Sequence, residues 1–426
     1  MMTKERAAHT LSVQMHALKA GGTIFIRFLY WVVIACVTGC VIGAVGAGFS
    51  YAMQYTTGLR TRHPWMIFLL PAAGLVIALL YRLNEDDRQG TNLVLASLRK
   101  EAEIPVSMAI SIFFSTVLTH MFGGSAGREG AALQLGGSLS AQFGRWLRLK
   151  DDDRRILTMC GMSACFAALF GTPIAAAVFC IEVVSVGVMY YAALVPCMIA
   201  AVSAAVTASF LGVHAESFSV EVISGIDVGI VLRVLVLGVL CALVSILFCR
   251  TMHAASWIGQ KITNRYVRVV VGGVIVIAAT MLLGTQMYSG AGMDVVEQAI
   301  SGTARPEAFL IKLLLTAVTL GFGYKGGEIV PSFFVGATFG CVMGGLLGLP
   351  PGFAAAIGLA AVFCGVTNCP ISALLMAAEL FGVGNLCYFF VAIAVSYQLS
   401  GYYGLYSKQK IMYSKYKPEF INIHAK

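Results

Sequence analysis

The 426-residue sequence is 58% hydrophobic and only 12% charged, and its mean hydropathy is +0.84. A soluble chain exposes most of its residues to water, so this composition excludes a soluble globular protein and indicates helices that cross a lipid bilayer. The net charge of +9 does not indicate nucleic-acid binding, because the basic residues gather in short segments between apolar runs, as they do in the cytoplasmic loops of membrane proteins.

Four parts follow one another along the chain. Residues 1–22 are polar and predict a cytoplasmic leader helix. The apolar runs beyond them predict two transmembrane repeats, 23–213 and 214–406, and 407–426 is expected to be a basic cytoplasmic tail. A spanning helix needs about 20 apolar residues, so the longest runs have to fold back as pairs of helices. We expect an all-α polytopic protein of a bacterial inner membrane, with both termini cytoplasmic.

Glycine-rich sequence interrupts the apolar runs in both halves, at 122–127 and at 321–327. Irregular backbone at membrane depth is tolerated only inside the protein or beside a water-filled cavity. Interrupted helices in corresponding positions of two halves indicate the binding site of a transporter.

An internal repeat supports this interpretation. A Pro-Ile pair at Pro173 is followed nine residues later by Glu182, and a Pro-Ile pair at Pro370 is followed nine residues later by Glu379. Matching landmarks in the same order indicate duplicated halves. The repeat alone leaves the relative orientation of the halves open.

Four glutamates lie within strongly apolar sequence: Glu129, Glu182, Glu328 and Glu379. A charge at the centre of a bilayer costs about 2.5–3.5 kcal/mol on insertion scales, so such residues are functional candidates. The symmetric placement of Glu182 and Glu379 favours a structural role in helix contacts. Glu129 and Glu328 are interpreted as functional.

The neighbours of Glu129 and Glu328 support that distinction. Glu129 lies in Gly127-Arg128-Glu129-Gly130, and Glu328 lies in the segment 326–331; each segment opens an apolar helix. The free N–H groups and the positive dipole end of a helix N-terminus attract anions. A carboxylate at the same place competes with the anion when it is charged and withdraws when it is protonated, which predicts a titratable gate.

The cysteines and histidines do not predict a metal or cofactor. None of the twelve cysteines forms a CxxC pair, and none has a histidine at metal-ligand spacing. Those inside apolar runs include Cys36, Cys40, Cys160, Cys165, Cys180, Cys341, Cys364 and Cys369. They are interpreted as small buried hydrophobic residues. We therefore expect no metal ligands, no cofactor and no catalytic residues.

An ordered set of motifs runs through the chain: Gly90-Thr91-Asn92, Gly127 to Gly130, Gly327 to Pro331, and Tyr406 in Gly404-Leu-Tyr-Ser. This set resembles the CLC family of anion channels and anion/proton antiporters over essentially the whole chain. The resemblance implies a CLC-type fold, in which two inverted-topology repeats with broken helices meet at a midplane anion site. It also implies a homodimer with one anion pathway per subunit.

Three departures from the common pattern point to one branch of that family. Asn92 follows the first-site residue, Val183 stands where chloride/proton antiporters carry an inner glutamate, and Glu328 places an acid in the third motif. Together these are similar to the fluoride/proton antiporter branch. That branch often has methionine at the position of Thr91, so the alternative of a chloride channel or chloride transporter stays open.

The resemblance implies roles for single residues. Glu129 is the gate and proton carrier, and Glu328 is a second acid. The groups implied to bind the anion are the side chains of Thr91, Asn92 and Tyr406 and the backbone N–H groups of Glu328 and Ile329. The residues implied to shape the loops and helix N-termini are Gly90, Gly127, Arg128, Gly130, Gly327 and Pro331, with Arg128 anchoring its loop.

Other polar and aromatic side chains receive structural interpretations. Phe333 and Phe334 are expected to pack, and His120 is expected to be a hydrogen-bonded side chain at the membrane interface. An intramembrane enzyme is the rival of a different class, but no aspartate lies in a span core and there is no HExxH motif. The resemblance implies a non-enzymatic antiporter that exports fluoride in exchange for protons and confers fluoride resistance.

Overall fold

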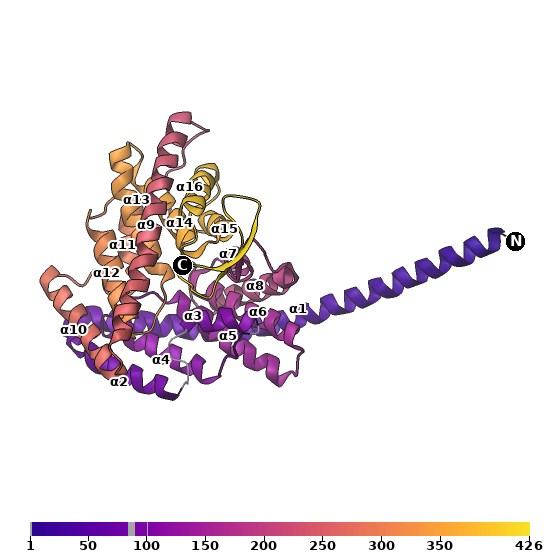
Figure 1. Ribbon diagram of the computed structural model, residues 1–426, viewed down its shortest axis with the longest axis horizontal. Helices are drawn as coiled ribbons and strands as arrows, with labels where there is room; N and C mark the ends of the chain where they lie inside the picture. Colours follow the sequence, from indigo (N-terminus) through magenta and orange to yellow (C-terminus); the bar gives the residue numbers. More distant parts are fainter. Residues whose placement is uncertain (1, 84–89, 100) are drawn as a thin grey trace.

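The computed structural model describes residues 2–83, 90–99 and 101–426, and this part of the chain is predominantly helical (Figure 1). Within it, five helices are long and apolar enough to cross a bilayer, and shorter apolar helices of 10–17 residues lie among them. The expected all-α, multi-pass membrane architecture is therefore confirmed.

The first half of the chain begins with the long helix α1, which extends away from the bundle toward the N-terminus (Figure 1). Its elements are α1 (Met2–Arg62), η1 (Pro64–Leu69), α2 (Leu70–Leu80), η2 (Tyr81–Leu83), α3 (Gly90–Leu98), α4 (Ser107–Met121), α5 (Glu129–Trp146), α6 (Asp151–Phe170), α7 (Pro173–Glu182), η3 (Tyr191–Ala193) and α8 (Leu194–Phe210). The predicted boundary after residue 22 falls inside α1, and the side chains of the leader lie outside the described residues.

The second half repeats this order. Its helices are α9 (Val228–Lys261), α10 (Arg265–Leu283), α11 (Met293–Ile300), α12 (Ala308–Gly321), α13 (Ile329–Leu347), α14 (Pro351–Thr367), α15 (Pro370–Phe381) and α16 (Leu386–Leu399). Helices α4 to α8 correspond in order and approximate length to α12 to α16, so the duplication seen in the sequence is a duplication of structure.

Reciprocal contacts between α7 and α15 show how the halves are oriented. The carboxylate of Glu182, at the end of α7, accepts the backbone N–H groups of Ile371 (3.1 Å) and Ser372 (2.8 Å) at the start of α15. Glu379, near the end of α15, accepts two N–H groups at the start of α7, at 3.0 and 2.8 Å. The two helices are therefore antiparallel, and each carboxylate satisfies N–H groups that a helix N-terminus leaves free. This is the structural role expected of both glutamates.

Close helix packing explains much of the glycine content. A Cβ atom on Gly136 of α5 would lie 2.1 Å from the carbonyl oxygen of Gly161 on α6. A Cβ atom on Gly336 of α13 would lie 2.4 Å from the carbonyl oxygen of Gly358 on α14. Both repeats thus bring two helix backbones into contact through paired glycines, as small residues allow in membrane proteins.

The segment predicted as a basic tail, 407–426, is built into the fold. It carries β2 (Lys410–Tyr413) and β3 (Phe420–His424), which pair antiparallel. Strand β2 also pairs in parallel with β1 (Ser185–Val186), which follows α7 in the first repeat. The sheet therefore ties the end of the second repeat to the first.

We predict that Gly336→Ala destabilises the protein by about 1–3 kcal/mol, because the added methyl group meets backbone rather than a movable side chain. Gly345→Ala on the same helix is the matched control: a Cβ atom there has nothing within 4 Å, so alanine is expected to be neutral or to stabilise by about 0.4–1 kcal/mol. Thermal unfolding of both variants in detergent checks the pair. Equal melting temperatures would contradict the prediction.

Candidate anion-binding site

The interrupted segments of the two halves meet head to head. Gly127 N–H donates to the carbonyl oxygen of Gly327 (2.7 Å), and Gly327 N–H donates to the carbonyl oxygen of Gly127 (2.6 Å). Both positions need glycine: a Cβ on Gly327 would lie 2.6 Å from the backbone nitrogen of Gly130. This antiparallel bridge brings the N-termini of α5 and α13 together.

Neither of these helix N-termini is capped by the side chain at its N-cap position. The cap residues are Arg128 for α5 and Glu328 for α13, and neither side chain accepts a hydrogen bond from its own first turn. Backbone N–H groups and the positive ends of two helix dipoles therefore converge on one small region. Such a region favours an anion without a directly bound cation.

The carboxylate of Glu129 lies in this region and is fully buried. Its Oε2 accepts the backbone N–H groups of Arg128 (3.0 Å) and Val330 (3.3 Å). Its Oε1 lies 3.4 Å from Nε of Arg128 and accepts no hydrogen bond. The Glu129 carboxylate thus lies at the start of α13, on N–H groups that favour a negative charge.

Val330 is a contact that the sequence-based expectation missed. The backbone N–H groups of Glu328 and Ile329 were expected to complete the site, but the α13 N–H group that reaches the carboxylate is that of Val330. Val330 is the second residue of α13. The signal was available in the sequence, because every N–H group in the first turn of a helix lacks an intrahelical acceptor.

Most of the other expected anion-site residues line one cavity, which we call the Tyr406 cavity. Its volume is about 340 Å³. The expected residues in its wall are Gly90, Thr91, Asn92, Glu328 and Tyr406. The Tyr406 hydroxyl is buried and has no hydrogen-bond partner among the described residues. Glu328 is half-buried, and its carboxylate makes no hydrogen bond or ion pair within that same part of the chain.

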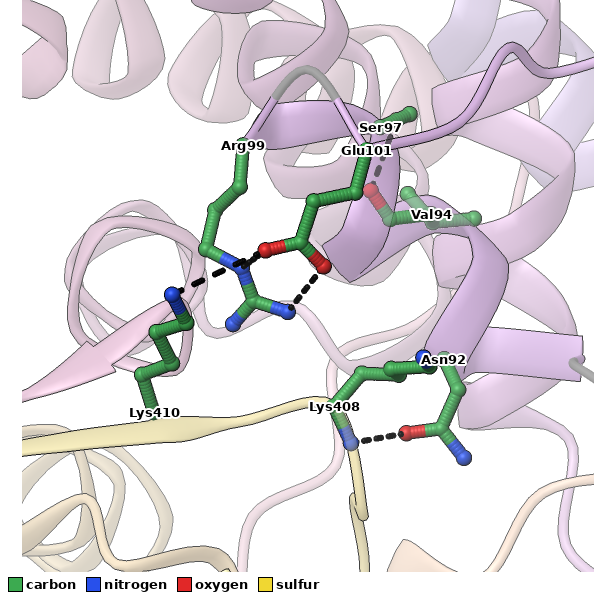
Figure 2. A network of polar contacts seen from close by, with 7 residues as sticks. All are labelled: Asn92, Val94, Ser97, Arg99, Glu101, Lys408 and Lys410. Carbon is green, nitrogen blue, oxygen red and sulfur yellow. Dashed lines mark hydrogen bonds and ion pairs between the residues drawn. The ribbon is translucent and has the colours of Figure 1, made fainter. Parts of the chain in front are cut away.

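Thr91 and Asn92 are each held by a hydrogen bond. The Thr91 hydroxyl accepts a hydrogen bond from Nε2 of Gln134 on α5 (3.1 Å). The Asn92 amide oxygen accepts the backbone N–H of Lys408 at 3.0 Å, as Figure 2 shows. Asn92 therefore connects the first turn of α3 to the segment that carries Tyr406.

An ion-pair network fixes the other end of α3 to the same segment (Figure 2). The Arg99 guanidinium donates to both carboxylate oxygens of Glu101, at 3.1 and 3.2 Å, and Lys410 Nζ lies 3.8 Å from Glu101. The hydrogen bond from Arg99 holds the pKa of Glu101 below its usual value. Lys410 begins β2, so both ends of α3 contact the C-terminal segment.

Gln409 is a second residue that the sequence analysis missed. Its side chain is fully buried. Its Nε2 donates to the carbonyl oxygens of Val183 (3.0 Å) and Thr367 (2.8 Å), and its Oε1 accepts Nδ2 of Asn368 (3.0 Å). Gln409 N–H also donates to the carbonyl oxygen of Tyr406 (2.8 Å). One amide thus holds the Tyr406 loop against the ends of α7 and α14.

A second cavity, which we call the Arg128 cavity, lies beside Arg128. Its volume is about 1060 Å³, and its wall includes Arg60, His120 and Arg128. Arg128 pairs with Glu216 (3.0 Å) as well as with Glu129, which fits the expected loop anchor. Glu129 lines neither cavity. Its carboxylate accepts the N–H groups of Arg128 and Val330. Arg128 lines the Arg128 cavity, and Glu328, two residues before Val330, lines the Tyr406 cavity.

His120 differs from its expected role. It is buried rather than interfacial; Nδ1 contacts the carbonyl oxygen of Thr116 (2.9 Å), and Nε2 has no partner among the described residues. Phe333 and Phe334 pack as expected. Phe333 lies edge-on to Phe170 and Phe363, with ring centroids 5.9 and 5.2 Å apart.

Ser125 lies in a G-x-S-x-G sequence, the pattern around the nucleophile of many hydrolases. The pattern lacks the required surroundings, because Oγ of Ser125 bonds Oγ1 of Thr316 (3.1 Å) instead of a histidine. The serine is buried beside the gate loop, and its contact joins α12 to that loop.

Comparison with known proteins identifies the family. Residues 73–401 match the profile of the family described as voltage gated chloride channel. The chain belongs to this CLC family. It is 35% identical to a chloride/fluoride channel protein of Pseudomonas syringae over 395 residues, which cover 91% of this chain and 87% of that protein. CLC proteins are channels and transporters, so the family assignment indicates transport rather than catalysis.

Solved CLC structures share the fold. The crystal structure of a CLC-type fluoride/proton antiporter matches with a TM-score of 0.87 and 32% identity, covering 90% of this chain and 98% of that one. A slow cyanobacterial Cl⁻/H⁺ antiporter matches with a TM-score of 0.75 at 19% identity, covering 87% and 94%. The expected CLC fold of two inverted repeats is therefore confirmed.

We predict that Tyr406→Phe weakens binding of the transported anion about tenfold or more, because it removes a buried O–H donor that has no protein partner. Stability is expected to change little. Tyr388→Phe is the opposite control: its hydroxyl bonds the carbonyl oxygen of Gly225 and the N–H of Asp227, each at 3.0 Å, so its loss costs about 1–3 kcal/mol of stability and leaves anion affinity unchanged. Calorimetric anion titration and thermal unfolding separate the two effects.

Proposed function

We propose that the protein is a membrane antiporter that exports fluoride in exchange for protons. The observation that carries this proposal is the buried carboxylate of Glu129, hydrogen-bonded to α13 between two cavities. Similarity to a chloride/fluoride channel protein and to a CLC-type fluoride/proton antiporter supports fluoride as the substrate. The acid at Glu328 also favours this branch.

The contacts of Glu129 suggest how exchange works. The charged carboxylate accepts the N–H groups of Arg128 and Val330 and blocks the path. A proton on the carboxylate removes its charge and weakens these hydrogen bonds, since charge-assisted bonds are about twice as strong as neutral ones. The side chain then leaves, and an anion takes its place on the N–H groups. Return of the carboxylate displaces the anion.

Fluoride suits the groups around this position. A small anion holds its water tightly, so it needs several strong donors to replace that water. The Val330 N–H group and the Thr91 and Tyr406 hydroxyls are within or beside the path. Glu328 adds a second proton-binding group in the same cavity, and we propose that it takes part in proton movement there.

Exchange of one fluoride for one proton would move two charges per cycle. Each charge contributes about 2.3 kcal/mol per 100 mV of membrane potential. A potential of about 100 mV therefore adds about 4.6 kcal/mol to the driving force for the export of each fluoride ion. This is enough to concentrate fluoride outside a cell and confer resistance.

We further propose that the protein is a homodimer of a bacterial inner membrane, with the Tyr406 cavity and both termini facing the cytoplasm. The excess of Lys and Arg in the segments around Arg145–Arg155 and near the C-terminus supports this orientation. The bacterial source of the Pseudomonas syringae relative supports the location.

The first test uses purified protein in liposomes loaded with equal fluoride and chloride, with ion-selective electrodes for both anions and a pH electrode. We predict fluoride release with coupled proton uptake, and loss of the coupling in Glu129→Gln. Glu379→Gln is the matched control, because it also removes a glutamate charge at a helix N-terminus, and its amide oxygen can still accept one of the two N–H groups at the start of α7. Chloride release without proton uptake would instead establish the chloride channel alternative.

A further inference from the structure

A buried positive charge lies behind the gate and has no carboxylate of its own. Lys312 on α12 is fully buried. Its Nζ donates to the carbonyl oxygens of Tyr288 (3.0 Å) and Gly290 (2.5 Å) and lies 5.2 Å from the ring centroid of Phe334. No acidic side chain of the described residues forms an ion pair with it.

The contacts of Lys312 support both halves of the anion site. Gly290, whose carbonyl it binds, also accepts the N–H of Ala126 (3.3 Å) and donates to the carbonyl oxygen of Gly124 (2.9 Å). That loop leads directly to Gly127 and Glu129. Phe334 lies in the second turn of α13. Lys312 therefore contacts Gly290, which binds the loop before α5, and Phe334, a side chain of α13.

A buried ammonium group is costly unless a negative charge compensates it, and two carbonyl oxygens and an aromatic ring supply only part of that compensation. The neighbouring cations have acidic partners: Arg128 pairs with Glu216, and Arg60 is attracted by Asp294. Lys312 is repelled by Arg60 and attracted by Glu129. Among the described residues, Glu129 is the acid that attracts Lys312, and it lies three residues after Ala126, whose N–H shares the Gly290 carbonyl oxygen with Lys312.

We propose that Lys312 is a positioning residue that couples proton arrival to anion arrival. Its positive charge favours one negative charge at the start of α13, either the Glu129 carboxylate or the transported anion. When a proton neutralises Glu129, Lys312 attracts the anion that replaces it. An empty gate with a protonated carboxylate is the disfavoured state, so leak of either ion alone is suppressed. This inference rests on the proposed exchange function.

The titratable and charged groups facing Lys312 come from several elements. Arg60 on α1, His120 on α4 and Glu129 at the start of α5 interact electrostatically with Lys312, and Tyr288 before α11 offers its carbonyl oxygen. Arg128 acts in turn on His120, and Asp294 on α11 acts on Arg60. Substitution of Lys312 alone removes one charge from this set, so the pH dependence of the variant is compared with that of the wild type at otherwise unchanged ionisable residues.

The test compares Lys312→Met with wild type in proteoliposomes, following fluoride and proton fluxes from pH 5 to 9. Without the buried cation, Glu129 holds its proton to higher pH. We expect the pH profile of transport to move upward by about one unit and the ratio of protons to fluoride to fall. Lys261→Met is the control, since Lys261 is exposed at the end of α9 against Trp257, and it is expected to keep the wild-type profile. Lys312→Gln, which keeps a donor for the carbonyl oxygens, replaces the methionine variant if that variant does not fold.

A purely structural lysine would lower the rate equally at every pH and leave the profile and the ratio unchanged, and that result would overturn the proposal. A second measurement does not depend on the coupling of fluoride to protons. Calorimetry compares the fluoride affinity of Glu129→Gln with that of the double variant Glu129→Gln, Lys312→Met. The added substitution is expected to weaken binding about tenfold, and equal affinities would also overturn the proposal. If the wild type transports fluoride without protons but the two variants still differ in fluoride affinity, only the proposed exchange function is contradicted.

Discussion

Two backbone hydrogen bonds between Gly127 and Gly327 hold the ends of two helices face to face. Everything at the candidate site depends on this contact. It sets the distance between α5 and α13, and it places Glu129 of one half against Val330 of the other. Only glycine allows it, because a side chain on either residue would meet backbone or the gate carboxylate itself. The part of the candidate site at these two helix ends is thus made of main chain, and its chemistry follows from how closely two backbones approach.

The same duplication uses its acids in two ways. Glu182 and Glu379 compensate the free N–H groups of α15 and α7 permanently, and each carboxylate accepts two of them. Glu129 also accepts two N–H groups, but Arg128 beside it and Glu328 before α13 line two different cavities. We propose that a glutamate at a helix N-terminus serves as a fixed cap or as a movable gate according to what surrounds it.

Sequence reasoning reached the fold and the main motifs because their signals are local. Charges in apolar sequence, glycine-rich interruptions and repeated Pro-Ile pairs can all be read directly, and they predicted Glu129, the broken helices and the duplication. Gln409 and Lys312 could not be recognised this way. A glutamine in a basic segment and a lysine in an apolar helix have ordinary solvent-facing explanations, since lysine commonly extends its ammonium group to the membrane surface. Only the packing of segments far apart in the chain shows both side chains to be fully buried.

The small sheet formed by β1, β2 and β3 has a consequence for biosynthesis. Strand β1 is made early, directly after α7, but its partner β2 emerges from the ribosome only after both repeats have been translated. The Tyr406 loop and Gln409 reach their places against Val183 at the same late stage. Both repeats can thus enter the bilayer before the ion path is complete. The pathway is closed as a final step of assembly, so a chain that inserts but has not yet docked this segment lacks the wall that contains Tyr406.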